Sequence, residues 1–309
     1  MDITIAICTW NRAELLRSTL RQMLSLDKGS GIDWEILVIN NNCSDNTSEI
    51  VAQFQHELPV REIAERKQGL SNARNCAVEN ARGELIVWTD DDVLVDSRFL
   101  VEYQRLNTLH RDAVFFGGPV EPSFDGVPPI WLVDNFEMID IVFAARDYGA
   151  EEFVIDSANP LCPFGANYAV RREVQRQYPY DPTLGRTGTD MISADETAVL
   201  KAILNSGQHG VWLPTVKVKH FIPEGRQTID YIRAYYAGHG ALMIRNSRQS
   251  SRLSFKGRPA WLWRRRLISE LAFQVRRFTA PAERWVPALK QAAIWQGAFE
   301  HFARQNRSE

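Results

Sequence analysis

The strongest constraint on the fold is the alternation of short apolar runs with helix-type segments over the first hundred residues. Apolar runs lie at 3–8, 34–39 and 84–89. The segments between them carry apolar residues at the 3.6-residue spacing of helices, most clearly from Asn11 to Leu24 and from Leu70 to Arg82. Strands that alternate with helices at this spacing predict a parallel, doubly wound sheet.

Local signals predict where these helices begin and end. Asn11 followed three residues later by Glu14 predicts a capping box at the start of the first helix. Ser44 or Asp45 is expected to cap the second helix. Gly83 is expected to close the third helix as a C′ glycine.

Polar residues follow three of the predicted strands. They are Thr9-Trp10-Asn11-Arg12, Asn40-Asn41-Asn42 and Asp90-Asp91-Asp92. In doubly wound sheets, ligands bind beyond the carboxyl ends of the strands. We therefore expect the three polar clusters to converge on one site.

The pattern changes from about residue 113. A strand is predicted at 113–118, and the loop-rich, proline-rich stretch 119–165 is expected to bind a ligand or act as a lid. A half-exposed strand is predicted at 211–219. Helices are predicted at 171–178, at 194–205 and over most of the chain from about residue 228.

Composition narrows the class of protein. The 309 residues carry a net charge of −2, so the chain as a whole is not expected to bind nucleic acid. The four cysteines form no CxxC pair, which argues against a zinc site or a disulfide framework and suits a reducing compartment. No signal peptide is recognised, and no apolar stretch approaches the roughly 18–20 residues of a membrane span, so a cytoplasmic location is expected.

The acidic triplet after the strand 84–89 is the best candidate for a metal site. Side chains alternate along an extended chain, so Asp90 and Asp92 are expected to share a face while Asp91 takes the other. Two carboxylates at the end of a strand suit Mg²⁺ or Mn²⁺, which take a few hard oxygens together with substrate phosphates. Clustered carboxylates repel one another unless a cation is present. The structural alternative is a polar turn that caps the next helix.

The turn after the first strand excludes two enzyme classes. Dinucleotide-binding folds place a pyrophosphate on a glycine-rich turn there, but residues 8–12 contain no glycine, and a Walker-type phosphate loop is also missing. A pyrophosphate bound by this sheet would need a metal ion and basic side chains instead. Dehydrogenases and P-loop enzymes are therefore disfavoured.

Taken in order, these motifs resemble glycosyltransferase family 2, inverting enzymes of the GT-A fold. The matching segments include 7–12, the run 35–47 (like the family's "VVDNGSTDGT") and 69–75 (like "GLSAARN"). Further matches are the acidic triplet, Phe164-Gly-Ala-Asn167 and Ala194-Asp-Glu-Thr197. The resemblance implies an α/β, GT-A type, doubly wound (Rossmann-like) mixed sheet flanked by helices, with a C-terminal helical extension.

The resemblance also implies a domain organisation. Residues 1–225 would form the catalytic domain, in which 1–112 is the nucleotide-sugar-binding half and 113–225 the acceptor-binding half. Residues 226–309 would form the C-terminal helical region. The activity implied is metal-assisted transfer of a hexose from a nucleotide diphosphate sugar, a UDP-sugar by preference, to a glycan or lipid-linked acceptor.

Carried over residue by residue, the resemblance assigns the donor side of the site. The expected nucleotide contacts are Thr9, Asn11, Arg12, Asn40, Asn42, Arg74, Asp90 and Asp91. Asn40 stands where the family usually has a base-binding aspartate; an amide both donates and accepts, so the preference for uracil is less certain. Asp92 is the expected metal ligand, with Asp90 and His220 as further candidates. For His220 the structural alternative is a surface or packing role.

An inverting transferase needs a carboxylate that takes the acceptor's proton. The resemblance assigns this role to Glu196, but the family usually has Glu-Asp where this chain has Asp-Glu, so Asp195 stays possible. The structural alternative is an acidic helix start that suits the helix dipole. Arg226 could neutralise the leaving diphosphate. Possible sugar contacts, each with an equally good structural explanation, are Trp131, Asn159, Asn167 and Tyr168.

The C-terminal fifth carries a tryptophan-rich and arginine-rich helix signal from Trp261 onward, preceded by a helical pattern that Gly238-His239-Gly240 interrupts. A basic amphipathic helix can lie on anionic lipid headgroups, so peripheral contact with the inner face of a membrane is one interpretation of this helix. Packing on the catalytic domain or in a homodimer is the other.

The competing functions for the whole protein are a nucleotidyltransferase on a similar sheet and a non-catalytic sugar- or nucleotide-binding module.

Overall fold

The computed structural model describes residues 1–187, 194–245, 254–255 and 258–305. These residues group into two compact units, and the boundaries fall within two strands and after a short helical turn. The first unit contains residues 1–123, 144–187 and 194–221, and the second contains residues 124–143 and those from 222 onward. The segment 124–143, which the sequence analysis assigned to the acceptor half, thus groups with the C-terminal helices.

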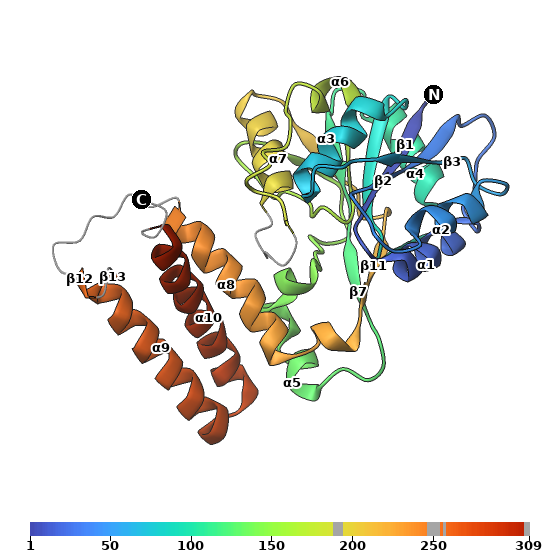
Figure 1. Ribbon diagram of the computed structural model, residues 1–309. Coiled ribbons are helices and arrows are strands. Elements are labelled where there is room, and N and C mark those ends of the chain that lie inside the picture. The colour runs from blue at the N-terminus through green and yellow to red at the C-terminus, as the bar shows by residue number, and fades with distance from the viewer. Residues whose placement is uncertain (188–193, 246–253, 256–257, 306–309) are drawn as a thin grey trace. The chain divides into compact units, whose positions relative to one another are not determined.

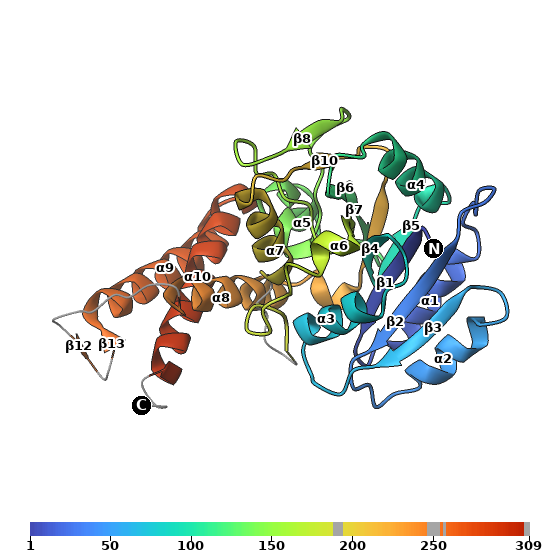
Figure 2. The same cartoon turned by 90° about the horizontal axis from the view of Figure 1, so that it is seen from above.

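The first unit is built on a mixed sheet whose parallel half is the predicted one. It contains β1 (Ile3–Thr9), β2 (Trp34–Asn40), β3 (Val60–Ala64) and β4 (Leu85–Asp90), in the order β3-β2-β1-β4 (Figure 2). Every neighbouring pair among these strands is parallel. The sequence analysis missed β3, because only Val60 among its residues is buried and its pattern lacks a clear apolar run.

The sheet continues beyond β4 with strands from the second half of this unit. They are β9 (Tyr168–Arg171), β6 (Phe115–Gly117), β10 (Gly210–Trp212) and β8 (Phe153–Ile155). Strand β9 runs antiparallel to both β4 and β6, which makes the sheet mixed. A second, three-stranded sheet contains β5 (Val93–Val95), β11 (Val218–Ile222) and β7 (Val120–Phe124).

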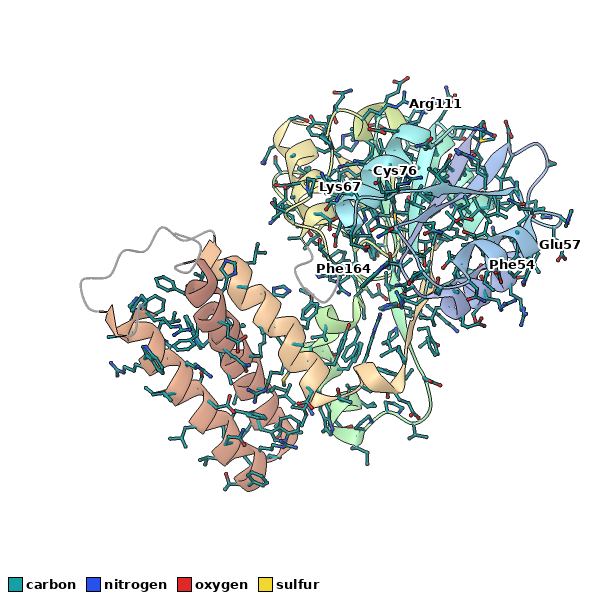
Figure 3. The ribbon with its side chains drawn as sticks, viewed as in Figure 1. Phe54, Glu57, Lys67, Cys76, Arg111 and Phe164 are labelled. Atoms are coloured by element: carbon teal, nitrogen blue, oxygen red, sulfur yellow. The ribbon has the colours of Figure 1, made fainter. Side chains whose placement is uncertain are left out.

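Helices cover both faces of the large sheet, as the alternating pattern requires. One face packs against α1 (Ala13–Met23), α2 (Thr47–Phe54) and α4 (Phe99–Leu109), and the other against α3 (Leu70–Asn80) and α7 (Asp195–Asn205). The short α6 (Arg172–Gln175) follows β9. Figure 3 labels one side chain of each layer, Phe54 from α2 and Cys76 from α3.

The predicted capping box at α1 is wrong. Asn11 has a positive φ of 52°, α1 begins at Ala13, and its N-cap residue makes no side-chain cap bond. Instead, the Ala13 N–H donates to the carboxylate of Asp45 at 3.0 Å, and the Thr47 N–H at the start of α2 donates to the same carboxylate at 3.2 Å. Asp45 therefore caps two helices; the prediction found it only for the second.

Gly83 is also not the predicted C′ glycine, because the residue after α3, Ala81, is already extended. A side chain at Gly83 would meet the backbone of Thr4 at 2.3 Å and that of Ile3 at 2.4 Å. The glycine is needed because two backbone segments approach closely, rather than because of a left-handed conformation.

The strand predicted at 211–219 is wrong as a single element. Strand β10 ends at Trp212 and pairs with β6 and β8, whereas β11 begins at Val218 and pairs with β5 in the other sheet. Pro214 lies between the two strands and has no N–H to donate to a ladder, so the run cannot continue through it.

The second unit is mainly helical. It contains α5 (Ile130–Val133), the 3₁₀ turns η1 (Phe136–Met138), η2 (Asp140–Phe143) and η3 (Glu224–Arg226), α8 (Ile229–Arg245), a two-stranded ribbon of β12 (Ser254–Phe255) and β13 (Arg258–Pro259), α9 (Ala260–Thr279) and α10 (Ala282–Gln305). Helix α10 packs against both α8 and α9 (Figure 1). The predicted helical character from about residue 228 is confirmed.

Glycines set the distance between α8 and α10. A side chain at Gly240 would meet the carbonyl oxygen of Ile294 at 1.9 Å, and one at Gly297 would meet that of Ala237 at 1.8 Å. Gly238-His239-Gly240 therefore does not interrupt the helical pattern, because α8 continues through it and the glycine allows close backbone packing.

The contact at Gly83 gives a first prediction. Gly83→Ala should lower the free energy of unfolding by about 1–3 kcal/mol, because the added methyl group overlaps the backbone at the start of β1. Urea unfolding followed by circular dichroism measures this. Gly225→Ala is the matched control, since a side chain there meets nothing within 4 Å. Equal stability of the two variants would show that β1 and the turn before β4 separate easily.

Candidate functional site

The carboxyl ends of β1, β2 and β4 carry the polar clusters that the sequence analysis expected to converge. Because β1 pairs with both other strands, Thr9 lies opposite Asn40 and Cys8 opposite Asp90. The three clusters therefore share one edge of the sheet, as predicted.

Arg12 joins the first cluster to the acidic triplet. Its guanidinium donates to Asp91 at 2.5 Å and also pairs with Asp92. The Thr9 hydroxyl donates to the second oxygen of Asp91 at 2.7 Å. Asp91 and Asp92 are 2% and 3% exposed, so both carboxylates are buried against a cation from the β1–α1 turn.

The alternation expected along the triplet does not hold, because β4 ends at Asp90 and the chain turns at Asp91 and Asp92. One guanidinium can therefore contact two consecutive carboxylates. Burial raises the pKa of Asp91 to about 7, with Arg12 opposing the shift and the charge of Asp92 adding to it. Asp90 is only half-buried. Its predicted contacts with nucleotide and metal stay predictions, as does the ribose contact of Asp91.

His220 lies beside the triplet. Its Nε2 is 3.3 Å from a carboxylate oxygen of Asp92, and the neighbouring Phe221 N–H donates to the Asp92 carbonyl at 2.8 Å. Strand β11 thus places His220 beside Asp92. These are two of the three predicted metal ligands.

The donor set fits a hard divalent cation only in part. Among the residues that the structure describes, no group of three or more His, Cys, Asp or Glu side chains is placed to hold a metal ion. Mg²⁺ is usually bound through one or two carboxylates while substrate phosphates and water fill the remaining positions. For an ion that a substrate diphosphate helps to hold, Asp92 and His220 are the candidate protein ligands, and their metal-binding roles stay predictions.

The second cluster surrounds Asn40. Its amide N–H₂ donates to Glu62 at 2.7 Å and to Ser48 at 3.2 Å, while its carbonyl oxygen accepts the Cys43 N–H at 2.8 Å. The sequence analysis did not single out Glu62, because it belongs to the unrecognised β3. Asn40 is thus held in one orientation by its neighbours.

The other asparagines of this region mainly shape the backbone. Asn11 accepts hydrogen bonds from the Ser44 N–H at 2.7 Å, which joins the turns after β1 and β2. Asn42 is exposed and has a positive φ of 61°. Asn41 is buried and bonds to the backbone of 65–69, the segment leading into α3. The nucleotide contacts assigned to Asn11 and Asn42 stay predictions.

A third cluster lies at the start of α7. The Arg74 guanidinium from α3 is 2.8 Å from Asp195 and 3.2 Å from Glu196, and the Ser71 hydroxyl donates to Asp195 at 3.1 Å. Arg74, predicted to contact nucleotide or phosphate, is thus paired with both candidate bases. Gly165 adjoins the pair, since a side chain there would come within 2.6 Å of Arg74.

The two acidic residues at the start of α7 differ in protonation. Burial opposes ionisation of Asp195, but the charge of Arg74 and the hydrogen bonds that Asp195 accepts lower its pKa. Burial raises the pKa of Glu196 to about 7, and the neighbouring Asp195 charge adds to this, while Arg74 opposes it. Asp195 is 0% exposed and Glu196 7%. The pKa values of the two neighbouring carboxyl groups are thus shifted in opposite directions, that of Asp195 down and that of Glu196 up.

Residues suggested as sugar contacts are placed less favourably. Asn167 is fully buried and bonds to the Tyr103 hydroxyl and to the carbonyls of Pro119 and Val216. Tyr168 is fully buried and stacks on Trp88. The structural alternative therefore accounts for both.

The remaining suggested residues are one loop residue of the first unit and two residues of the second unit. Asn159 is on an exposed loop. Trp131 packs on Trp285, and Arg226 lies over the ring of Tyr231, both within the second unit. Residues 188–193, which precede α7, lie outside the described residues.

Comparison with known proteins identifies the family. The profile described as "Glycosyl transferase family 2" matches residues 4–178, more than half of the chain. A succinoglycan biosynthesis protein of Rhizobium meliloti is 26% identical over 135 residues, which is 43% of each chain. The matched region thus covers less than half the length of this relative. The glucosyl-dolichyl phosphate glucuronosyltransferase of Haloferax volcanii is 20% identical over 246 residues, 77% of this chain and 76% of that protein.

Solved structures show the same fold. The S. aureus TarS fragment 1–349 has a TM-score of 0.54 at 13% identity and covers 100% of this chain and 92% of that one. A mannosyltransferase from Pyrobaculum calidifontis, in complex with GDP-Man and Mn²⁺, has a TM-score of 0.54 at 16% identity, covering 99% and 75%. The mixed sheet, its helical layers and the family match agree: the chain belongs to glycosyl transferase family 2 and has the GT-A fold.

Proposed function

We propose that the protein is an inverting hexosyltransferase that moves a sugar from a nucleoside diphosphate sugar to a glycan or lipid-linked acceptor, with Glu196 as the general base. The observation that carries the proposal is the pair at the start of α7, where Glu196 has a pKa of about 7 beside Asp195, whose pKa is lowered. A general base works best when its pKa lies near the working pH.

The choice of Glu196 over Asp195 rests on exposure and charge. Asp195 is fully buried, and Arg74 and Ser71 both contact one oxygen of its carboxylate, which lowers its pKa and disfavours its protonation. Glu196 retains slight exposure and a raised pKa, because Asp195 repels its negative form. Asp195 and Arg74 are then positioning residues that set the proton affinity of Glu196.

The reaction follows as a single displacement. The acceptor hydroxyl transfers its proton to the Glu196 carboxylate while its oxygen forms a bond to the anomeric carbon. The bond from that carbon to the diphosphate oxygen breaks, and its electron pair leaves with the nucleoside diphosphate. Attack from the side opposite the leaving group inverts the configuration at the anomeric carbon.

For the leaving group, we propose that Asp92 and His220 hold a divalent Mn²⁺ or Mg²⁺ ion, with Asp90 as a neighbouring carboxylate. The 3.3 Å approach of His220 to Asp92 supports this, as does the Mn²⁺ in the solved complex of the Pyrobaculum mannosyltransferase. Such an ion would neutralise charge that develops on the diphosphate. Arg12, which already pairs with Asp92, would hold the carboxylate in place.

We propose UDP as the nucleotide carrier. The Asn40 carbonyl oxygen accepts one N–H from Cys43 and has a second lone pair, which suits the single imide N–H of uracil. Guanine presents two adjacent donors, for which a free carboxylate is the better partner. Solved complexes of TarS with UDP and UDP-GlcNAc support the choice, although the Pyrobaculum enzyme's complex contains GDP-Man.

A lipid-linked acceptor is supported by the name of the Haloferax relative, a glucosyl-dolichyl phosphate glucuronosyltransferase. A polysaccharide acceptor is supported by the succinoglycan biosynthesis protein. Family membership speaks against the nucleotidyltransferase alternative. Slow metal-dependent hydrolysis of a nucleotide sugar would rule out a non-catalytic binding module.

The first test concerns the base. Hydrolysis of the sugar donor is measured against pH, and the wild-type rate should rise as pH passes about 7, because Glu196 must lose its proton to act. Glu196→Gln should remove this rise and lower kcat by about 10²–10⁴. The donor KM should be unchanged, since Glu196 acts on the attacking oxygen.

Asp195→Asn separates the two candidates. Removing the Asp195 charge lowers the pKa of Glu196, so the rising limb should move to lower pH while substantial activity is kept. An Asp195→Asn variant as inactive as Glu196→Gln, with no limb left, would assign the base to Asp195. Glu173→Gln, on the exposed surface of α6, controls for loss of a carboxylate.

The metal proposal is tested without turnover. UDP with Mn²⁺ should raise the Tm of the wild-type protein, and UDP without metal should raise it much less. Asp92→Asn should abolish the metal-dependent part, because it removes one of two protein ligands. Asp134→Asn, an exposed carboxylate in the second unit, should behave like the wild type. A full Mn²⁺ response in Asp92→Asn would contradict the assignment.

The nucleotide is tested by the same Tm measurement with UDP and GDP in the presence of Mn²⁺. UDP should give the larger shift, because Asn40 offers one acceptor. A larger shift with GDP would overturn the uracil assignment and leave the metal and base assignments intact.

A further inference from the structure

Helix α9 has an apolar face that the rest of the described chain does not cover. The exposed fractions are 62% for Leu267, 66% for Leu271, 52% for Val275 and 81% for Phe278, and Ile268 beside them is 56% exposed. These residues recur at the i, i+4, i+8 and i+11 spacing, so they form one stripe along the helix.

The stripe is not the face by which α9 packs. Leu262 and Phe273 are buried in the apolar clusters that α9 shares with α10. At about 100° per residue, Phe273 points to the side of the helix opposite the stripe. The helix thus has two apolar faces, one that stabilises the unit and one that remains exposed.

Charge around the stripe indicates what covers it. Helix α9 carries five arginines at 264–266 and 276–277, and its one acidic residue, Glu270, is paired with Arg233 of α8 at 2.8 Å. Arg264 and Arg276 are exposed. An apolar stripe about 16 Å long with basic residues at both ends matches a surface that offers hydrocarbon and negative charge together.

We propose that α9 docks the protein on a membrane surface containing anionic lipid headgroups, with the stripe from Leu267 to Phe278 in the acyl boundary and the arginines on the phosphates. The contact is peripheral, because no described helix has the length and apolar content to cross a bilayer. Leu267, Leu271 and Phe278 are the residues that enter the lipid.

A second copy of the chain fits the same face less well. Two α9 helices that met through their stripes would bring exposed arginines at both ends close together, and like charges at such contacts are unfavourable. The inference does not rest on the proposed transferase mechanism, since it concerns residues of the second unit only.

The test is co-sedimentation of the full chain with phosphatidylcholine vesicles, with and without phosphatidylglycerol. Binding should require the anionic lipid and weaken as salt rises, because the headgroup attraction is screened. The triple variant Leu267→Gln/Leu271→Gln/Phe278→Gln should lower the partition coefficient at least about tenfold, since each side chain loses burial in lipid. Arg264→Gln/Arg276→Gln should weaken binding at low salt only.

Leu109→Gln is the matched control, because Leu109 is 61% exposed but lies on α4 in the first unit. It should bind like the wild type. Thermal unfolding and donor hydrolysis in solution should be unchanged in all these variants, which separates loss of docking from loss of fold or catalysis. Absence of binding to anionic vesicles, or full binding by the triple variant, would overturn the proposal. A wild-type dimer that the triple variant dissociates, without vesicle binding, would assign the stripe to a second copy.

Discussion

The site depends on the rule that a carboxylate is not buried without a counter-charge. Two arginines supply it: Arg12 for Asp91 and Asp92, and Arg74 for Asp195 and Glu196. The paired residues are 79 positions apart in the first case and 122 in the second. Desolvating either set unpaired would cost several kcal/mol per charge. Arg12 therefore holds the turn after β1 to the end of β4, and Arg74 holds α3 to the start of α7.

The two arginines produce different chemistry because their surroundings differ. Arg12 contacts both carboxylates of its pair, and His220 adds a neutral or cationic ring to Asp92. Arg74 lies closer to Asp195, which Ser71 also stabilises, so the negative charge concentrates there and Glu196 retains a proton more readily. A pair of like groups with separated pKa values is what acid–base chemistry near neutral pH requires. In the proposed reaction, the ion site on the donor side and the base on the acceptor side thus share one physical basis. Each contains two buried carboxyl groups beside one arginine.

The second unit is held together by close packing of helices rather than by buried ion pairs at a site. Close packing of α8 on α10 needs no side chain at Gly240 or Gly297, and the resulting helices bury one face of α9 while leaving the stripe exposed. An exposed stripe of this size lowers solubility unless something covers it. In the proposed docking, an anionic lipid surface covers the stripe and the exposed arginines of α9 contact its phosphates.

The sequence by itself determined three of the four strands of the parallel half, β1, β2 and β4, because apolar runs and helical periodicity are local properties, and it placed the three polar clusters at the ends of these strands. Its ordered motifs also determined the family. Only the tertiary structure decided that Asp45 caps two helices, that Gly83 and Gly240 serve close backbone approach, and that Arg74 faces Asp195 and Glu196. Likewise, the unequal acidity of that pair cannot be deduced from an Asp-Glu dipeptide. Each of these features depends on atoms brought together from distant segments, and no local pattern records which segments will meet.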